Sequence, residues 1–530
     1  MMLIIADHYR LTPQISISIM YTSILLAMVV MHLTLFLCYG KIFHARKEKR
    51  TPTNWPVLGM LPGALANIGR PHEYITEVLQ QNGGTFYHKG PWFTNLNIMF
   101  TCDPVNVHYI QAKNFSNFQK GPEFKKMFDI MGEGILTAES ESWENQRRSA
   151  KSLINNTSFL EFVATTTSNK METALIPILE VASETGLEVD MQELFERLTF
   201  DSSCILVLGH DPVSLCKELP YLPHEKAFVD AEEAIFYRHV LPEFTWKLQS
   251  WLRIGKENKM SKAKEIIPRF LSYCISAKHQ KHGNNDINGL NMLTSYNNRA
   301  LAEKGALNEP NNINISDDEK VWKDTLLNLM FAGKGTISAA LTWLFWLLAT
   351  NPEEEEKIRQ EMLTNLHVDK SSSKWKFEDL KKLNYLHGAV CETLRLYPTI
   401  AFQFKSTVEH DILPSGHAIN ANTKTVLSLY SMGRMESIWG KDCLNFKPGR
   451  WINPETGRIK TEPSFKFSAF NSGPRSCLGK EITFIQMKIV AAAIMSRFHF
   501  RVAQGHLISP SASVVLHMKH GLKVKVSDYA

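Results

Sequence analysis

Residues 467–498, FSAFNSGPRSCLGKEITFIQMKIVAAAIMSRF, decide the fold because a patterned loop runs directly into an apolar stretch with helical spacing. The loop reads Phe470-x-x-Gly473-x-Arg475-x-Cys477-x-Gly479. A cysteine at a helix start faces unpaired backbone N–H groups and the positive end of the helix dipole, and both stabilise a thiolate. An axial ligand to iron needs such a thiolate. A buried structural cysteine is the alternative interpretation.

The other fixed positions of this loop have physical roles of their own. Gly473 permits a tight turn, and Arg475 can pair with a carboxylate. Gly479 lets a flat ring system approach the backbone. The loop therefore predicts a site for a flat group that contains iron.

Two segments upstream precede this loop. CETLRLYP, residues 391–398, places Glu392 and Arg395 on one helical face. FKPGRW, residues 446–451, adds Arg450. An E-x-x-R pair alone is weak evidence, because solvated pairs of this kind are common and contribute little. The order of the three segments carries more information than any one of them.

Together these residues resemble the cytochrome P-450 superfamily, and SWENQRRSA at 142–150 has that family's W-x-x-x-R helix. The resemblance implies a mainly α fold with a minor β part and haem b as the cofactor, with Cys477 as the axial iron ligand. It implies a buried network of Glu392, Arg395 and Arg450 behind the haem. The expected haem contacts are Trp143, Arg147, Lys405, Phe470, Gly473, Arg475 and Gly479, of which Trp143, Arg147 and Lys405 are expected near the propionates.

Several longer segments are similar to a plant branch that holds midchain alkane hydroxylases and fatty-acid omega-hydroxylases. They are NWPVLGMLPG at 54–63, residues 120–144, LPSGHAINANTK at 413–424 and MKHGLKV at 518–524. This similarity implies a monooxygenase that inserts one oxygen atom from O2 into an unactivated C–H bond of a long-chain aliphatic substrate, an alkane, a fatty acid or a derivative. Electrons are expected from a separate NADPH-dependent flavoprotein reductase, because the chain has no G-x-G-x-x-G fingerprint.

The stretch FAGKGTIS, residues 331–338, departs from the family pattern. The family's oxygen-activating helix usually reads A-G-x-(Asp/Glu)-Thr, and here Gly335 precedes the expected catalytic Thr336. An acid at that position orients or relays protons, which glycine cannot do. We expect Lys334 to lie on a different helical face and to reach solvent. Two alternatives therefore stay open: a haem-thiolate lyase or isomerase of oxidised lipid, and a non-catalytic haem- or lipid-binding relative.

The N-terminal region predicts a membrane anchor. Residues 15–39 contain no Asp, Glu, Lys or Arg, and a helix of that length spans a bilayer. The basic cluster that follows predicts a cytosolic main domain. We expect an anchor at 1–40, a basic and proline-rich neck at 41–63, and a haem-binding catalytic domain at 64–530, held by a single span in the endoplasmic reticulum membrane. A cleaved signal peptide is the alternative.

Composition excludes several other classes of protein. Of the 530 residues, 44% are hydrophobic and 21% are charged, which is typical of a globular protein. The net charge of +6 is too small to indicate a nucleic-acid partner. Short strand-like segments such as TFYHKG, KTVLSLY and GLKVKV interrupt a mainly helical pattern. We expect the apolar run 326–352 to form a buried central helix rather than a membrane span, because it contains Lys334 and two glycines.

Overall fold

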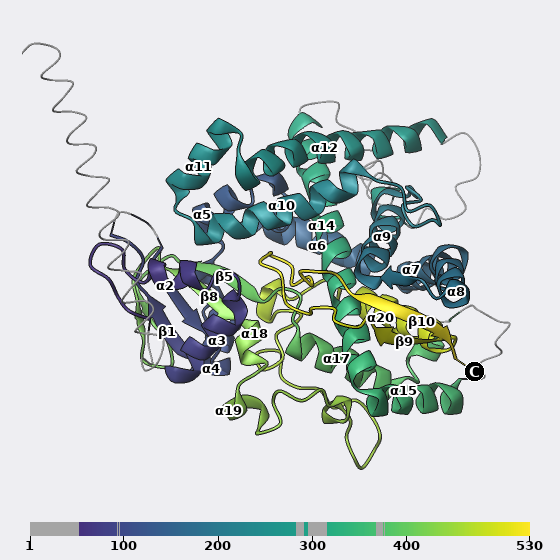
Figure 1. Ribbon diagram of the computed structural model, residues 1–530. Helices are drawn as coiled ribbons and strands as arrows, with labels where there is room; N and C mark the ends of the chain where they lie inside the picture. Colours follow the sequence, from purple (N-terminus) through teal and green to yellow (C-terminus); the bar gives the residue numbers. More distant parts are fainter. Residues whose placement is uncertain are drawn as a thin grey trace, which may run out of the picture.

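The computed structural model describes residues 52–92, 94, 96–281, 291–294, 315–366, 375 and 377–529. The predicted membrane anchor at 15–39 lies outside the described residues. Helices account for most of the described chain, so the predicted mainly α fold with a minor β part is confirmed (Figure 1).

The first half of the described chain contains the following α-helices. They are α2 (Leu61–Ala66), α3 (Pro71–Gln81), α4 (Pro104–His108), α5 (Gly121–Met127), α6 (Ser140–Ile154), α7 (Thr157–Lys170), α8 (Ile176–Thr185), α9 (Met191–Ser203), α10 (Pro223–Val240), α11 (Glu243–Leu252) and α12 (Gly255–Lys281). The second half contains α14 (Ile315–Thr350), α15 (Pro352–Asn365), α16 (Phe377–Leu380), α17 (Asn384–Leu396), α18 (Leu429–Met432), α19 (Glu436–Trp439) and α20 (Lys480–Met495).

Three small sheets flank the helices. The largest has the order β1 (Thr85–His88), β2 (Ile98–Thr101), β8 (Lys424–Ser428), β5 (Phe402–Thr407) and β3 (Phe118–Gln119). Its β2–β8 pair is parallel and its other pairs are antiparallel. The second sheet has the order β4 (Glu188–Asp190), β10 (Lys523–Asp528) and β9 (Phe498–Val502), and the third pairs β6 (Asp411–Ile412) with β7 (Ala418–Ile419). The segments TFYHKG, KTVLSLY and GLKVKV contribute β1, β8 and β10, as predicted.

Helix α14 is the central helix of the molecule. Its segment Lys320–Thr350 is long and apolar enough to cross a membrane, but 78% of its most apolar window is buried inside the protein. The helix ends at Thr350, directly before the Asn351-Pro352 pair, because proline cannot continue it. α14 is therefore an interior helix, as the sequence predicted.

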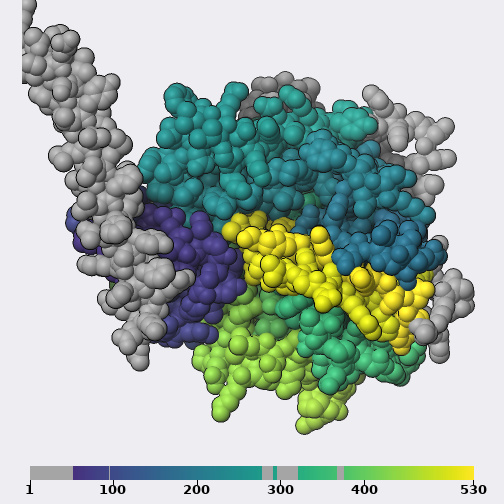
Figure 2. Space-filling model, viewed as in Figure 1, coloured from purple at the N-terminus to yellow at the C-terminus, as the bar shows by residue number. Residues whose placement is uncertain are grey.

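The C-terminal residues pack onto this interior helix. The Trp343 indole of α14 donates a 2.7 Å hydrogen bond to the carbonyl of Leu516 and stacks on Tyr397, with 3.9 Å between ring centroids. Figure 2 shows the C-terminal segment, in yellow, lying between the N-terminal part in purple and the helices in teal. The last 30 residues of the chain thus help to close the interior around α14.

Candidate functional site

The loop before α20 holds the predicted cysteine in a fixed turn. The Cys477 amide donates a 2.7 Å hydrogen bond to the carbonyl of Phe470, and the Phe470 ring contacts Phe484 of α20 at 5.3 Å between centroids. Gly479 is the N-cap of α20, so Cys477 lies two residues before the cap. The cysteine therefore sits next to the unpaired N–H groups of a buried helix, as the pattern predicted.

The two glycines of this loop have different surroundings. Gly473 has φ +65°, and a Cβ atom there would overlap the backbone carbonyl of Gln111. No other residue fits that position without a shift of backbone. At Gly479 a Cβ would meet only the Cys477 sulfur, at an ordinary 3.8 Å. The protein itself therefore leaves room for a side chain at Gly479. A glycine at such a position is explained if a bound group, packed over the cysteine, needs that space.

Cys477 differs from the other cysteines of the described part. All seven are free, and Cys477 is exposed whereas five are buried and Cys216 is intermediate. The Cys477 side chain is accessible to water-sized molecules but lies deep enough that burial raises its pKa. The Gly479 amide and the charge of Arg147 lower that pKa only in part. The expectation that the helix start alone stabilises the thiolate is thus incomplete, because desolvation outweighs it.

Four basic side chains gather beside Cys477 with little negative charge among them. They are Lys120, Arg147, Lys405 and Arg475. Within the described residues, the one ion pair that they form is a 2.5 Å contact of Arg475 with Glu139. The Arg147 guanidinium donates instead to the Ser476 hydroxyl at 3.1 Å. Arg475 Nε is buried and has no hydrogen-bond partner in the described part of the chain.

Desolvation dominates the electrostatics of these cations. Burial, with the charges of Lys405 and Arg475, lowers the Lys120 pKa to about 7. Burial and the Arg475 charge lower the Lys405 pKa to about 8. Burial also lowers the pKa values of Arg147 and Arg475. A cluster of this kind is suited to a group with two negative charges, and the two propionates of haem b match it.

Aromatic rings support the same cations. Trp143 of α6 is buried, and the guanidinium groups of Arg475 and Arg147 lie 4.5 and 5.8 Å from its ring centroid. Lys405 lies 5.3 Å from the Phe115 ring. The sequence analysis missed Lys120, whose only signal was its place directly before the Gly-Pro that begins α5. Contacts between segments hundreds of residues apart bring these side chains together, and spacing along the chain cannot reveal them.

A buried ion-pair network lies on the other side of the cysteine loop. Arg395 Nε donates a 2.8 Å hydrogen bond to Glu392 Oε2, and Arg395 Nη2 donates one of 2.8 Å to Glu392 Oε1. Arg450 Nε lies 3.3 Å from Glu392 Oε1, and the Trp451 indole donates to Oε2 at 2.9 Å. Arg395 also donates to the carbonyls of Gly433, Cys443 and Asn445. The structure thus brings together the three residues predicted to form a network.

The predicted catalytic helix presents an open face. Ala332 is exposed and Thr336 is half-buried, although most of α14 is buried. The Thr336 hydroxyl donates to the Ala332 carbonyl at 2.7 Å. A Cβ at Gly333 would lie 2.9 Å from the Ser203 hydroxyl of α9. Gly333 is therefore small because α9 packs against it, which is a local reason that the sequence analysis did not foresee.

The prediction for Lys334 was wrong. Its side chain is 1% exposed, and its Nζ has no hydrogen-bond partner among the described residues. The charge of Lys334 acts on Glu225 of α10 and on His517, so the lysine lies on the side of α14 that these residues face. Gly335 next to it faces Glu232 of α10: a Cβ at residue 335 would lie 2.9 Å from Glu232 Oε1.

An apolar cavity of about 120 Å³ lies between the N-terminal sheet and the end of α10. Its lining includes Ile75, Ile98, Phe100, Phe236, Phe402 and Phe404. Phe404 precedes Lys405 on β5, so the cavity borders the strand that carries one of the clustered cations. The cavity is suited to an apolar molecule.

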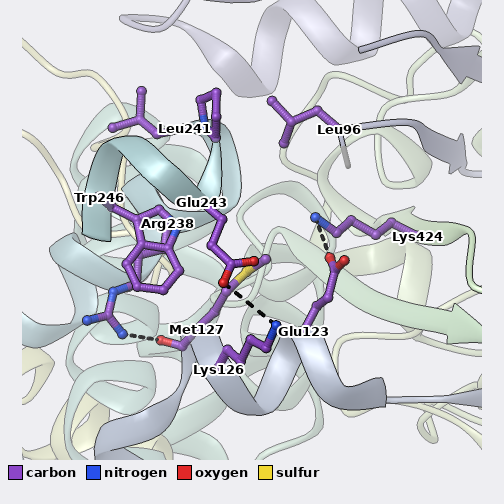
Figure 3. A pocket seen from close by; sticks show the side chains of 10 residues that line it. Leu96, Glu123, Lys126, Met127, Arg238, Leu241, Glu243, Trp246 and Lys424 are labelled. Atoms are coloured by element: carbon purple, nitrogen blue, oxygen red, sulfur yellow. Dashed lines mark hydrogen bonds and ion pairs between the residues drawn. The ribbon is translucent and has the colours of Figure 1, made fainter. Parts of the chain in front are cut away.

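A second cavity, of about 40 Å³, shares Leu96 with the first, and half of its ten lining residues are charged (Figure 3). Figure 3 shows the pair of Lys424 with Glu123, the pair of Lys126 with Glu243, and Arg238 donating to the Met127 carbonyl. These contacts join α5 to the sheet and to α10 and α11. The second cavity is too small for a substrate, and we assign it a structural role.

Comparisons with known proteins agree with this geometry. The family profile for Cytochrome P450 matches residues 50–526. Alkane hydroxylase MAH1 of Arabidopsis thaliana is 43% identical over 477 residues, which cover 89% of this chain and 93% of that protein. Noroxomaritidine synthase of Narcissus aff. pseudonarcissus MK-2014 is 38% identical over 538 residues, covering 99% and 97%. Cytochrome P450 86B1 of Arabidopsis thaliana is 37% identical over 497 residues, covering 91% and 87%.

The similarity spans the cation cluster, the central helix and the cysteine loop alike. An accessible cysteine before a buried helix, beside basic side chains that suit two propionates, is what a haem-thiolate protein requires. The chain therefore belongs to the cytochrome P450 family, binds haem b and is a P450 monooxygenase.

Proposed function

We propose that this protein hydroxylates an unactivated C–H bond of a long-chain aliphatic substrate, using O2 and electrons from a separate NADPH-dependent flavoprotein reductase. The observation that carries the proposal is the combination of Cys477, accessible and capped by the Gly479 amide, with the four basic side chains beside it. When bound, haem b would supply the activation of O2, and the Cys477 thiolate would supply electron density that favours this chemistry.

The residues of the site take the following roles in this proposal. Cys477 would hold the haem iron through its thiolate. Lys120, Arg147, Lys405 and Arg475 bind the two propionates, and Trp143 holds the two guanidinium groups in place. Gly479 would leave space for the flat ring system, and the sharp turn at Gly473 positions the loop.

The network around Glu392 supports the loop from behind rather than touching the cofactor. Arg395 joins Glu392 to three backbone carbonyls, so it fixes the chain that leads into FKPGRW. Thr336 lies on the open face of α14, where its hydroxyl can hydrogen-bond the reacting oxygen. These residues position the site, and the cofactor performs the oxidation.

Two observations support an aliphatic substrate. The cavity of about 120 Å³ is lined mainly by apolar side chains. One relative, 43% identical, is named as an alkane hydroxylase. Another relative is named as a noroxomaritidine synthase, so an aromatic substrate belongs among the compounds to be tried.

Membrane attachment would bring such a substrate to the cavity. In α11, Phe244, Leu248, Trp251 and Leu252 are exposed, and their spacing places them on one side of the helix. Val240 and Leu241, at the end of the preceding helix, line the two cavities. We propose that this side of α11 contacts the endoplasmic reticulum membrane, to which residues 15–39 anchor the chain with its catalytic domain in the cytosol.

The spectrum of the reduced, carbon-monoxide-bound protein tests the ligand assignment. A red-shifted Soret band is expected for the full chain, because it reports a thiolate trans to carbon monoxide. Cys477→Ala should lose that band, and the matched control Cys216→Ala should keep it. A band that persists in Cys477→Ala contradicts the proposal.

A second measurement separates the proposed activity from its alternatives. Turnover of a lipid hydroperoxide without reductase, and with no product from O2 and NADPH, would identify a lyase or isomerase. A normal carbon-monoxide spectrum with no turnover in either assay would identify a non-catalytic haem protein. With NADPH as the electron source, we expect product only when reductase and O2 are both supplied.

A further inference from the structure

A carboxylate from another helix packs directly against Gly335 of α14. Helix α10 crosses α14 so that Phe228 contacts Phe331, with 4.6 Å between ring centroids. Four residues later on both helices, Glu232 meets Gly335. Glu232 is 4% exposed, and its Oε1 lies 2.9 Å from the position that a Cβ of residue 335 would take. The carboxylate thus fills the space into which a side chain at residue 335 would project.

Glu232 is joined to a buried imidazole and a second carboxylate. His517, in the segment before β10, places Nε2 3.1 Å from Glu232 Oε2. Its Nδ1 lies 3.5 Å from Glu196 Oε1 on α9. The exposed fractions of the side chains rise from 5% for Glu232 to 7% for His517 and 17% for Glu196. The three groups therefore form a row that leads from α14 toward solvent.

The charges around this row favour its ability to hold a proton. Burial lowers the His517 pKa, but the hydrogen bond to Glu232 and the charges of Glu196 and Glu232 outweigh it, so the pKa is raised. The charge of Lys334 opposes the rise in the His517 pKa. The same charge favours the ionised form of Glu225, which pairs with Arg197 at 3.9 Å. The acid that α14 lacks is thus replaced by a buried row of titratable groups, in which Glu232 and His517 share a hydrogen bond and His517 Nδ1 is unpaired among the described residues, 3.5 Å from Glu196.

We propose that Glu232 of α10 supplies the carboxylate that α14 lacks at Gly335, and that His517 and Glu196 connect it to solvent as a proton relay. The inference rests on the proposed monooxygenase function and names the proton donor for it. His517, protonated between the two carboxylates, passes the proton on Nε2 to Glu232 Oε2. Glu232 then delivers a proton through water toward the Thr336 hydroxyl and returns to the carboxylate. The neutral imidazole shifts its remaining proton from Nδ1 to Nε2 through water, and Nδ1 takes a replacement that solvent supplies by way of Glu196, so each cycle moves one proton from solvent toward the site.

Glu232→Gln in the full-length, haem-loaded protein tests the relay. With reductase, NADPH and hexadecanoic acid, or another aliphatic compound that shifts the Soret band, NADPH oxidation should continue. Product per NADPH should fall roughly tenfold or more, with the electrons recovered as hydrogen peroxide. Iodosylbenzene donates an oxygen atom without needing protons, so product formed with it should stay within about twofold of wild type.

Two further variants separate a relay from a structural role. Glu225→Gln removes a buried carboxylate seven residues earlier on the same helix and should leave coupling unchanged. Glu232→Gln combined with Gly335→Asp returns an acid to α14 and should recover most of the lost coupling. Gly335→Asp alone places two carboxylates in one space and should give no gain. Wild-type coupling in Glu232→Gln, or an equal loss with iodosylbenzene, overturns the relay.

A readout that needs no turnover checks the contact itself. In resting protein labelled with [13C]histidine, the His517 signal is identified by its loss in His517→Gln. Its pKa should fall in Glu232→Gln and move far less in Glu225→Gln; an unchanged pKa overturns the relay. If the wild type forms no product with either oxidant system, the proposed function fails and the relay fails with it, whatever the histidine titration gives.

Discussion

At the scale of single residues, the sequence predicted the ligand loop but not the side chains that complete the site. Cys477, Arg475 and Gly473 stand within five residues, so their spacing alone reveals them. Lys120 and Glu232 are ordinary charged residues in their own segments. Their roles depend on contacts with residues far away in the chain, such as Arg475 and Gly335, which periodicity cannot show.

Replacing Gly473 with alanine should be costly. The residue needs φ +65°, and the added Cβ would overlap the Gln111 carbonyl, so we expect a loss of ~2–5 kcal/mol in the free energy of unfolding. Urea unfolding of the haem-loaded protein measures it. Gly505→Ala is the control, because Gly505 has φ +75° with nothing within 4 Å of its Cβ position. Equal losses in both variants would show that the backbone angle alone is responsible.

The basic cluster predicts an unusual pH dependence of stability in the haem-free protein. The Lys120 and Lys405 pKa values are lowered to about 7 and about 8, from the ordinary 10.5. The unfolded chain then binds more protons than the folded one between those values and pH 10.5, so stability should rise with pH across that window. Haem b should flatten the rise, because propionates favour the charged lysines. Unfolding followed at several pH values, with and without haem, measures both effects.

At the scale of the elements, α17 depends on one carboxylate. Glu392 is fully buried and neutralises Arg395, which is 2% exposed. Glu392→Ala leaves that arginine uncompensated, and we expect a loss of about 3–5 kcal/mol in unfolding free energy. In Glu378→Ala, the exposed pair with Lys381 is lost, and the change should be below about 1 kcal/mol. Comparable losses in the two variants, measured by denaturant unfolding, would mean that the network adds little.

Helix α14 shows where reasoning from periodicity succeeded and where it failed. The apolar run predicted a buried helix that ends before Asn351-Pro352, and both features are confirmed. The same run predicted a solvated Lys334, and that was wrong. A charge inside an apolar stretch favours exposure only if no neighbour covers it, and the sequence does not say that α10 crosses α14 there.

Helix α11 should meet the membrane through its apolar side. Trp251 is 79% exposed, whereas Trp246 on the same helix is 8% exposed. We expect brominated lipids in vesicles to quench the tryptophan fluorescence of the full chain. The Trp251→Phe variant should lose most of the quenching that comes from this region. Trp246→Phe should change the quenching little. Equal quenching in wild type and Trp251→Phe would place α11 away from the bilayer.

At the scale of the whole molecule, the fold could be predicted because three motifs in the correct order resemble one family, and the family profile covers nearly all of the chain. The spatial arrangement of the helices and the position of the apolar cavity could not be predicted, because they depend on packing between distant segments. The exposed side of α11 follows the end of α10, where Val240 lines the apolar cavity together with Phe402 and Phe404 of β5. Under the proposed function, this arrangement suits a substrate that arrives from a membrane.

One measurement tests the central claim most directly. The full chain, with haem b, an NADPH-dependent reductase and a panel of alkanes and fatty acids, is incubated under 18O2, and the products are analysed by mass spectrometry. We predict at least one hydroxylated aliphatic product that carries a single 18O atom, formed by wild type and not by Cys477→Ala. Products whose new oxygen comes from water, or no product from any member of the panel despite an intact carbon-monoxide spectrum, would contradict the account.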